Sequence, residues 1–205
     1  MVDTDALRAD LAVMADWIVE GSRVLDAGCG DGALLHWLVT HKQADARGIE
    51  ISQPLVADCI AKGLSVMQGD ADEDLAYYPD NSFDYVVMGH ALQRMQRPDQ
   101  TLQELMRIGK QVLISLPNFA HWKNRLYLLA NGRMPVTGAL AYEWYETPNI
   151  HFCSLTDFVK LCDSLGIAVE RELFITRRGK IGAFSERDWL ANFFGEQGVF
   201  LLRKK

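Results

Sequence analysis

Four residues near the start of the chain have types and spacing that could hold a charged ligand. Asp26 ends an apolar, strand-like run, and glycines follow at every second position as Gly28, Gly30 and Gly32. A strand that turns into a helix over glycines brings bare backbone N–H groups to a ligand at the positive end of the helix dipole. Because three glycines cost conformational entropy that a plain turn does not require, we predict a cofactor loop that includes Cys29.

The charge of Asp26 indicates which cofactor this loop holds. Gly28, Gly30 and Ala33 also fit the dinucleotide fingerprint. A carboxylate beside a pyrophosphate is repelled, by roughly 4 kcal/mol at about 4 Å and an effective dielectric of about 20. S-adenosylmethionine instead carries an α-ammonium and a sulfonium. We therefore predict S-adenosylmethionine or S-adenosylhomocysteine, and the same charge argues against an oxidoreductase that binds NAD.

Two further acids stand where predicted strands end. Glu50 ends the second strand, where its two oxygens can accept both ribose hydroxyls. Asp70, preferred over the nearby Asp72, follows the third strand, and a carboxylate there can accept a hydrogen bond from an adenine amino group. The plain alternatives are a solvated surface glutamate and an aspartate that only stabilises a turn. With their neighbours Ile51 and Ala71, these acids join the predicted cofactor-binding residues.

The end of the fourth predicted strand, residues 83–88, contributes Gly89 and His90 to the same crevice. Gly89 is expected at its rim, where the methionine part of a cofactor or a substrate would lie. An imidazole that titrates near pH 7 suits proton removal, so His90 is the one candidate for a catalytic base. A structural or helix-capping histidine is the stronger alternative.

The elements that position these residues alternate as strand and helix through five units, from residue 23 to residue 117. This alternation predicts an α/β fold with a parallel, doubly wound sheet. Right-handed crossovers place the carboxyl ends of the strands, with the residues named above, along one edge. An amphipathic helix is expected over about 3–20, lying across the edge of the sheet. A sixth strand at 167–176 and a last strand at 199–202 complete the sheet.

Residues 119–153 interrupt this alternation with a predicted helix at 119–131 and a long aromatic segment. A long connection without clear periodicity is typical of a lid or a binding loop. Aromatic residues and arginine are favoured at protein interfaces, although some of these rings are expected to fold back into the core. His121 and His151 lack a ligand set, so we expect no metal site. The predicted partner-binding residues are Trp122, Arg125, Tyr142, Trp144 and Tyr145.

The composition limits the class of protein. The 205 residues suit one domain, 1–205, and the formal charge of −6 lacks the basic footprint of a nucleic-acid-binding protein. No apolar run reaches the roughly 18 residues of a membrane span, and the N-terminus has no signal-peptide pattern. Four scattered cysteines fit reduced thiols. We therefore expect a cytoplasmic protein that contacts neither membrane nor nucleic acid.

Taken together, these motifs resemble the class I methyltransferase fold. The resemblance implies a seven-stranded, mostly parallel, Rossmann-like sheet in the order 3-2-1-4-5-7-6, with an antiparallel last strand. It also implies that S-adenosylmethionine lies among Asp26, Gly28, Gly30, Glu50 and Asp70.

A longer resemblance covers nearly the whole chain. The segments L-P-N-F-A-H-W-K-N-R-L, G-R-M-P-V-T-G and Y-E-W-Y-E-T-P-N-I-H-F-C are similar to the MetW family of bacterial methionine-biosynthesis proteins. This resemblance implies a link with homoserine O-acyltransferase (MetX), which acylates homoserine early in methionine synthesis, and support of that enzyme's activity. It supplies no known methyl acceptor.

Two functions therefore stay open. The first is an accessory or regulatory subunit that binds the cofactor and docks on the acyltransferase. The second is a small-molecule methyltransferase that uses the insert as a lid. The chain lacks the Asn/Asp-Pro-Pro-Tyr/Phe sequence with which amino-methylating relatives hold their acceptor. Transfer from a sulfonium needs mainly alignment of the reactants, so a missing base does not exclude catalysis.

Overall fold

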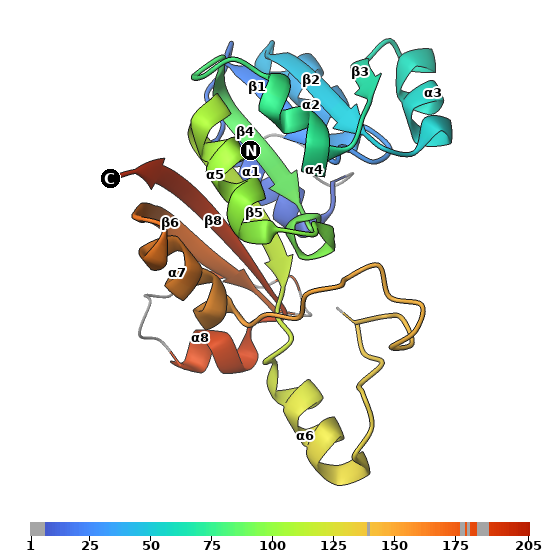
Figure 1. Cartoon of the computed structure of the whole chain (residues 1–205), viewed down its shortest axis with the longest axis vertical. Coiled ribbons are helices and arrows are strands. Elements are labelled where there is room, and N and C mark those ends of the chain that lie inside the picture. The colour runs from blue at the N-terminus through green and yellow to red at the C-terminus, as the bar shows by residue number, and fades with distance from the viewer. Residues whose placement is uncertain (1–6, 139, 177–178, 180, 184–188) are drawn as a thin grey trace.

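The computed structural model describes residues 7–138, 140–176, 179, 181–183 and 189–205. These residues form one eight-stranded sheet in the order β3-β2-β1-β4-β5-β8-β6-β7 (Figure 1). The parallel strands that come first in the chain are β1 Arg23–Ala27, β2 Asp45–Glu50, β3 Ser65–Gln68, β4 Phe83–Gly89 and β5 Gly109–Pro117. The strands that follow are β6 Ile167–Ile175, β7 Ile181–Ala183 and β8 Gln197–Lys204.

Helices connect these strands. They are α1 Ala9–Trp17, α2 Ala33–Lys42, α3 Gln53–Ala61, α4 Ala71–Asp74, α5 Pro98–Ile108, α6 Trp122–Asn131, α7 Leu155–Ser164 and α8 Trp189–Phe194, with 3-10 turns η1 Leu75–Tyr77 and η2 Leu92–Arg94. Within the described ranges, no helix has the length and apolar character needed to cross a membrane.

Helices cover both faces of the sheet. On one face, α1, α2 and α3 pack against the strands in a core that contains Met14 and Leu35. On the other face, α5 and α7 pack in a second core that contains Leu105 and Phe158. Because side chains alternate along a strand, consecutive buried residues of β4 serve both cores. The doubly wound α/β architecture is confirmed.

The predicted strand order is confirmed as well. The seven expected strands lie in the order 3-2-1-4-5-7-6, where β8 is the last of them and runs antiparallel to both β5 and β6. An eighth strand, β7, was not predicted. It pairs with residues 173–175 at the end of β6 and spans only three residues, too few to show a periodic pattern.

The N-terminal helix differs from the prediction in length and position. Residues 3–6 of the predicted range lie outside the described part of the chain, and α1 ends at Trp17 because Ile18 has extended backbone angles. The helix does not lie across an edge of the sheet. Val13 and Ile18 pack instead on one face, in the core that includes Leu113 of β5 and Val199 of β8. The apolar side of α1 buries more surface on the face of the sheet than an edge would offer.

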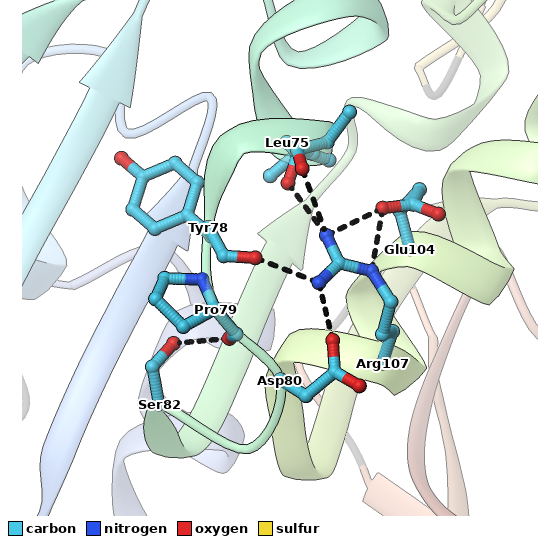
Figure 2. A network of polar contacts seen from close by, with 8 residues as sticks. Leu75, Tyr78, Pro79, Asp80, Ser82, Glu104 and Arg107 are labelled. Carbon is cyan, nitrogen blue, oxygen red and sulfur yellow. Dashed lines mark hydrogen bonds and ion pairs between the residues drawn. The ribbon is translucent and has the colours of Figure 1, made fainter.

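One arginine of α5 holds the connection between β3 and β4 (Figure 2). The Nη1 atom of Arg107 donates to Tyr78 O at 2.7 Å and to Asp80 Oδ1 at 2.6 Å. Its Nη2 atom donates to Leu75 O at 3.0 Å and to Glu104 Oε2 at 2.7 Å. A single guanidinium thus satisfies carbonyl groups of an irregular segment, which fixes the path from the end of β3 back into the sheet.

The chain leaves the sheet after β5. Helix α6 and the segment that follows it lie below the sheet in Figure 1, before the chain returns through α7. Helix α6 begins at Trp122, three residues later than the predicted start at 119, and ends at the predicted residue, 131. Ser154 and Asp157 form a capping box at the start of α7.

Candidate functional site

The glycine loop joins β1 to α2 at the carboxyl edge of the sheet. Gly28, Gly30 and Gly32 have φ angles of 82°, 57° and 75°, in the left-handed region that glycine adopts most readily. The N–H groups of Gly28 and Cys29 donate to Ile49 O at 2.8 and 3.2 Å. These hydrogen bonds hold the loop against the end of β2.

Glu50 ties the same loop to its own strand. Its Oε2 atom accepts a hydrogen bond from Gly30 N at 2.9 Å, and its Oε1 atom accepts one from Ser52 N at 2.9 Å. Each carboxylate oxygen can accept about two hydrogen bonds, so acceptor capacity is left for hydroxyls of a ligand. The residue is 8% exposed, whereas its neighbour Ile51 is 63% exposed at the rim. Glu50 therefore shapes the loop, and Ile51 offers an apolar surface beside it.

Asp26 lies buried at the end of β1. Burial raises the pKa of Asp26 to about 7. The positive charge of Arg8 opposes this rise, and the negative charges of Glu50, Asp10 and Asp31 add to it. A cation bound beside this carboxyl would lower its pKa again. The electrostatics of the loop therefore favour a positively charged ligand over a phosphate.

Asp70 and Ala71 lie at the start of α4. Asp70 caps this short helix, because its Oδ1 atom accepts from Asp72 N at 2.9 Å. The backbone N–H of Asp70 donates to Asp74 Oδ2 at 2.8 Å. Asp70 therefore stabilises a turn, which is one of the two roles that the sequence allowed for it. A cap of this kind leaves acceptor capacity on the half-buried carboxylate.

A polar cluster that the sequence pattern did not predict lies beside Gly89. Asp10 of α1 is fully buried and accepts hydrogen bonds from Arg8 Nε at 2.6 Å, Arg8 Nη2 at 2.9 Å and Ser115 Oγ at 2.6 Å. Although burial opposes it, the hydrogen bond from Arg8, the positive charges nearby and the Ser115 hydroxyl hold the pKa of Asp10 below its usual value. The signal in the sequence was a carboxylate on the apolar side of α1, next to Leu11 and three residues after Leu7.

His90 belongs to this cluster. Its φ of 55° is in the left-handed region, which costs a non-glycine residue roughly 1–2 kcal/mol. Its Nε2 atom lies 3.6 Å from Asp10 Oδ2 and, among the described residues, is buried without a hydrogen-bond partner. Burial lowers the pKa of His90, so the imidazole is neutral near pH 7. The base role of His90 stays a prediction, because the same contacts serve a structural histidine.

The five predicted partner-binding residues divide into two groups. Tyr142, Trp144 and Tyr145 are 52%, 68% and 66% exposed, and the last two rings meet edge to face with centroids 5.6 Å apart. Trp122 is half-buried. The Arg125 guanidinium lies 5.4 Å from the centre of a phenylalanine ring in α8. The first three belong to the segment after α6 and the last two to α6, and Trp122 alone among the five is not largely exposed to solvent.

Helix α6 is inverted relative to an ordinary surface helix. Its one buried residue is the polar Asn124, whereas Leu126 and Leu129 are 52% and 83% exposed. Exposed apolar patches commonly mark interaction sites. We call six of the exposed apolar side chains of α6 and of the segment after it the insert surface: Leu126, Leu129, Tyr142, Trp144, Tyr145 and Ile150.

Asn118, directly after β5, anchors the insert and was also missed. Its fully buried side chain donates from Nδ2 to Asn192 O and Gly195 O, both at 2.8 Å. Its Oδ1 atom accepts from Ala120 N at 3.0 Å. One amide thus joins the end of β5, the start of the insert and α8. The sequence showed an unusual segment here, but not these distant partners.

A cavity of about 460 Å³ lies at the base of the insert. Its lining includes His121, Lys123, Asn124, Thr137 and Glu196. It lies close to the carboxyl end of β5, because Glu196 O accepts the hydrogen bond of Asn118 N at 2.8 Å.

Several proteins are similar to this chain in sequence. A family model described as methionine biosynthesis protein MetW matches residues 8–202. A bifunctional methionine biosynthesis protein MetXA/MetW of Rhodopirellula baltica is 30% identical over 177 residues, which cover 82% of this chain and 28% of that relative. The chain therefore spans little more than a quarter of that protein. A demethylmenaquinone methyltransferase of Listeria welshimeri is 24% identical, over 81% of this chain and 78% of the enzyme.

Solved structures share the fold at low sequence identity. One is a SAM-dependent methyltransferase, possible histamine N-methyltransferase, of Thermotoga maritima, with a TM-score of 0.69, 17% identity, and coverage of 96% of this chain and 88% of that one. Another is an S-adenosylmethionine-dependent methyltransferase of Mesorhizobium loti, with a TM-score of 0.67, 15% identity, and coverage of 98% and 99%. These likenesses show the class I methyltransferase fold. From the family match over residues 8–202, the chain belongs to the MetW family of methionine-biosynthesis proteins.

Proposed function

We propose that this protein binds S-adenosylmethionine or S-adenosylhomocysteine at the carboxyl edge of its sheet. Three features support this: the left-handed glycine loop, the Glu50 carboxylate with spare acceptor capacity, and the buried acid Asp26. The ribose hydroxyls would meet Glu50, the adenine would lie near Ile51 and Asp70, and the α-ammonium would meet Asp26. When bound, S-adenosylmethionine would supply a methyl group activated by its sulfonium.

Calorimetry on the purified protein tests this binding. S-adenosylmethionine and S-adenosylhomocysteine are expected to release or absorb heat at one site per chain, and NAD is expected to give none. Binding of NAD without binding of either adenosyl amino acid would refute the proposal.

We further propose that the protein partners and activates a homoserine O-acyltransferase. The observation that carries this proposal is the relative whose name joins MetXA and MetW in one chain. Two modules joined in one chain meet at high effective concentration, whereas separate chains need a contact surface to stay together. The insert surface, with its exposed aromatic and leucine side chains, is suited to that contact.

Copurification with a homoserine O-acyltransferase, followed by an acylation assay, tests the partnership. The complex is expected to form and to acylate homoserine faster than the acyltransferase alone. The double variant Trp144→Ala, Tyr145→Ala should lose both effects. Tyr77→Ala is the matched control, because that ring is 84% exposed but belongs to η1, outside the insert. Absence of a complex together with an unchanged acylation rate would end this proposal.

A small-molecule methyltransferase is the second candidate function. The cavity at the base of the insert favours it, since its polar lining beside the end of β5 could receive an acceptor. The similarity to named methyltransferases gives further support. Incubation with labelled S-adenosylmethionine and broad metabolite extracts is the test, and labelled product is expected only under this second function.

We place this function in the cytoplasm. All four cysteines are free thiols, and three of them are buried. Unpaired thiols persist where glutathione keeps the compartment reducing.

A further inference from the structure

We propose that Arg8 binds the α-carboxylate of the adenosyl amino acid, while the nearby Asp26 carboxyl meets the α-ammonium. This inference rests on the proposed cofactor and adds a residue to its site. The pair Arg8 and Asp26 would recognise the amino-acid end of the ligand as a zwitterion.

The guanidinium of Arg8 is held in place with part of its surface free. Asp10 binds it through Nε at 2.6 Å and Nη2 at 2.9 Å, and Asp10 is itself anchored by Ser115 Oγ. The Asp10 side chain is 0% exposed, whereas that of Arg8 is 47% exposed. Arginine has five N–H donors, and Asp10 takes two of them. The remaining donors, on Nη1 and Nη2, form a fork that fits a carboxylate, and the buried ion pair fixes its orientation in advance.

The position of Arg8 agrees with such a role. A Cβ atom at residue 89 would lie 3.2 Å from Arg8 Nη2, so the guanidinium packs on the bare backbone of Gly89 at the end of β4. Strand β4 lies beside β1, where Asp26 is paired in register with Val87. Arg8 and Asp26 are close enough that the positive charge of Arg8 lowers the pKa of Asp26. A cation and an acid thus flank the edge where β1 and β4 end.

The chain contains the same local pair at a second place, which provides a matched control. Arg97 precedes α5 as Arg8 precedes α1, and it binds Asp99 two residues later through Nε at 3.1 Å and Nη2 at 2.8 Å. Those side chains are 61% and 38% exposed at the start of α5. Replacing Arg97 and Asp99 together leaves the net charge unchanged, as replacing Arg8 and Asp10 together does.

The experiment compares two ligands on four purified proteins by calorimetry. S-adenosylhomocysteine carries the amino-acid end, and 5′-methylthioadenosine lacks it. The proteins are the wild type, Arg8→Met with Asp10→Asn, Arg8→Lys, and the control Arg97→Met with Asp99→Asn. Each double variant removes both charges of its pair, so the first leaves no buried unpaired carboxylate, and thermal unfolding verifies that each protein is folded. Arg8→Lys keeps the charge but loses the fork.

We expect the variant Arg8→Met with Asp10→Asn to bind S-adenosylhomocysteine roughly 10- to 100-fold more weakly while its affinity for 5′-methylthioadenosine is unchanged. Arg8→Lys should fall between that variant and the wild type, and Arg97→Met with Asp99→Asn should match the wild type. Unchanged affinity for S-adenosylhomocysteine, or an equal loss for both ligands, would overturn the inference and leave the proposed cofactor intact. A wild-type protein that binds neither ligand would overturn the proposed cofactor site itself, and this inference with it.

Discussion

Asp26 combines a proposed binding role with a cost to stability. Its pKa is raised to about 7 in the folded protein, mainly by burial, against about 3.9 for an aspartate in an unfolded chain. Between these pH values the folded protein keeps a proton that the unfolded chain has released. Stability therefore falls as pH rises from about 4 to about 7, and above that range the full cost remains. A cation that binds beside this buried carboxyl stabilises its ionised form and so offsets the cost.

Asp26→Asn should therefore separate stability from binding. The variant removes the titration, so we expect a higher melting temperature than wild type at pH 8 and little difference near pH 4. Wild-type affinity for S-adenosylhomocysteine should rise between pH 6 and pH 8 as the carboxyl ionises, whereas the variant should bind weakly with little dependence on pH. Melting curves and calorimetry at these pH values measure both effects. A variant that binds as tightly as the wild type at pH 8 would contradict the assigned contact.

Gly30 and Gly63 allow a second test at the residue scale. Both have left-handed φ angles, 57° and 78°, and a Cβ at either position would meet no atom within 4 Å. An alanine costs each site a similar backbone strain, roughly 1 kcal/mol. Gly30 alone belongs to the loop and donates to Glu50. We expect both Ala variants to lose similar stability, and only Gly30→Ala to weaken S-adenosylhomocysteine binding, by about 10-fold or more. Equal binding by the two variants would argue against the loop as the cofactor site.

At the scale of elements, a few buried amides anchor the insert. Asn118 joins the end of β5 to α8. Asn124 extends this framework, because its Nδ2 atom donates to Phe119 O at 3.0 Å and its Oδ1 atom accepts from Thr137 Oγ1 at 2.6 Å. These bonds free the leucines of α6 to face outward. Polar anchoring of this kind explains how an inverted helix keeps a defined position.

Asn118→Ala should loosen the insert. Loss of the amide leaves two carbonyl groups and one N–H group without this partner, so we expect a stability loss of about 2–3 kcal/mol and faster proteolysis within residues 119–153. Asn131→Ala is the control, since that exposed amide makes a single bond to Tyr127 O. Urea unfolding and limited proteolysis measure the two effects. Identical behaviour of the two variants would show that Asn118 does not anchor the insert.

At the scale of the whole molecule, the proposed cofactor site and the start of the insert both lie at the carboxyl ends of the parallel strands. Helix α1 and β4 border the first, and the insert leaves directly after β5, the neighbour of β4. A ligand at one site can influence a partner at the other only if it binds the free and docked states with different affinities. The coupling must then be reciprocal.

We expect such coupling if the cofactor reports methionine supply to the acyltransferase. S-adenosylmethionine should change the affinity for the acyltransferase by a factor of about 5–150, and the acyltransferase should change the affinity for S-adenosylmethionine by the same factor. Titrations of each ligand in the presence and absence of the other measure both quantities. Equal affinities in the free and docked states would show that the cofactor is a structural ligand without a signalling role.

Local features made much of this protein predictable from its sequence. The strand–helix alternation, the glycine spacing and the acids at strand ends all act within a few residues, and the strand order followed from the resemblance they supported. The family segments likewise could be recognised without any structure. These local sequence features predicted the class of fold and the position of the candidate site.

Contacts between distant residues were decided only by the tertiary structure. Asp10 reaches Ser115 across 105 residues and also meets His90, and Asn118 reaches α8 across 74 residues. The periodicity of apolar residues along the sequence does not predict such pairs, because they form only when α1 and α8 pack against the sheet. The sequence determined where the loop, the acids and the insert occur. Folding decided that α1 lies on a face of the sheet, that α6 turns its leucines outward, and that an arginine stands beside the glycine at the end of β4.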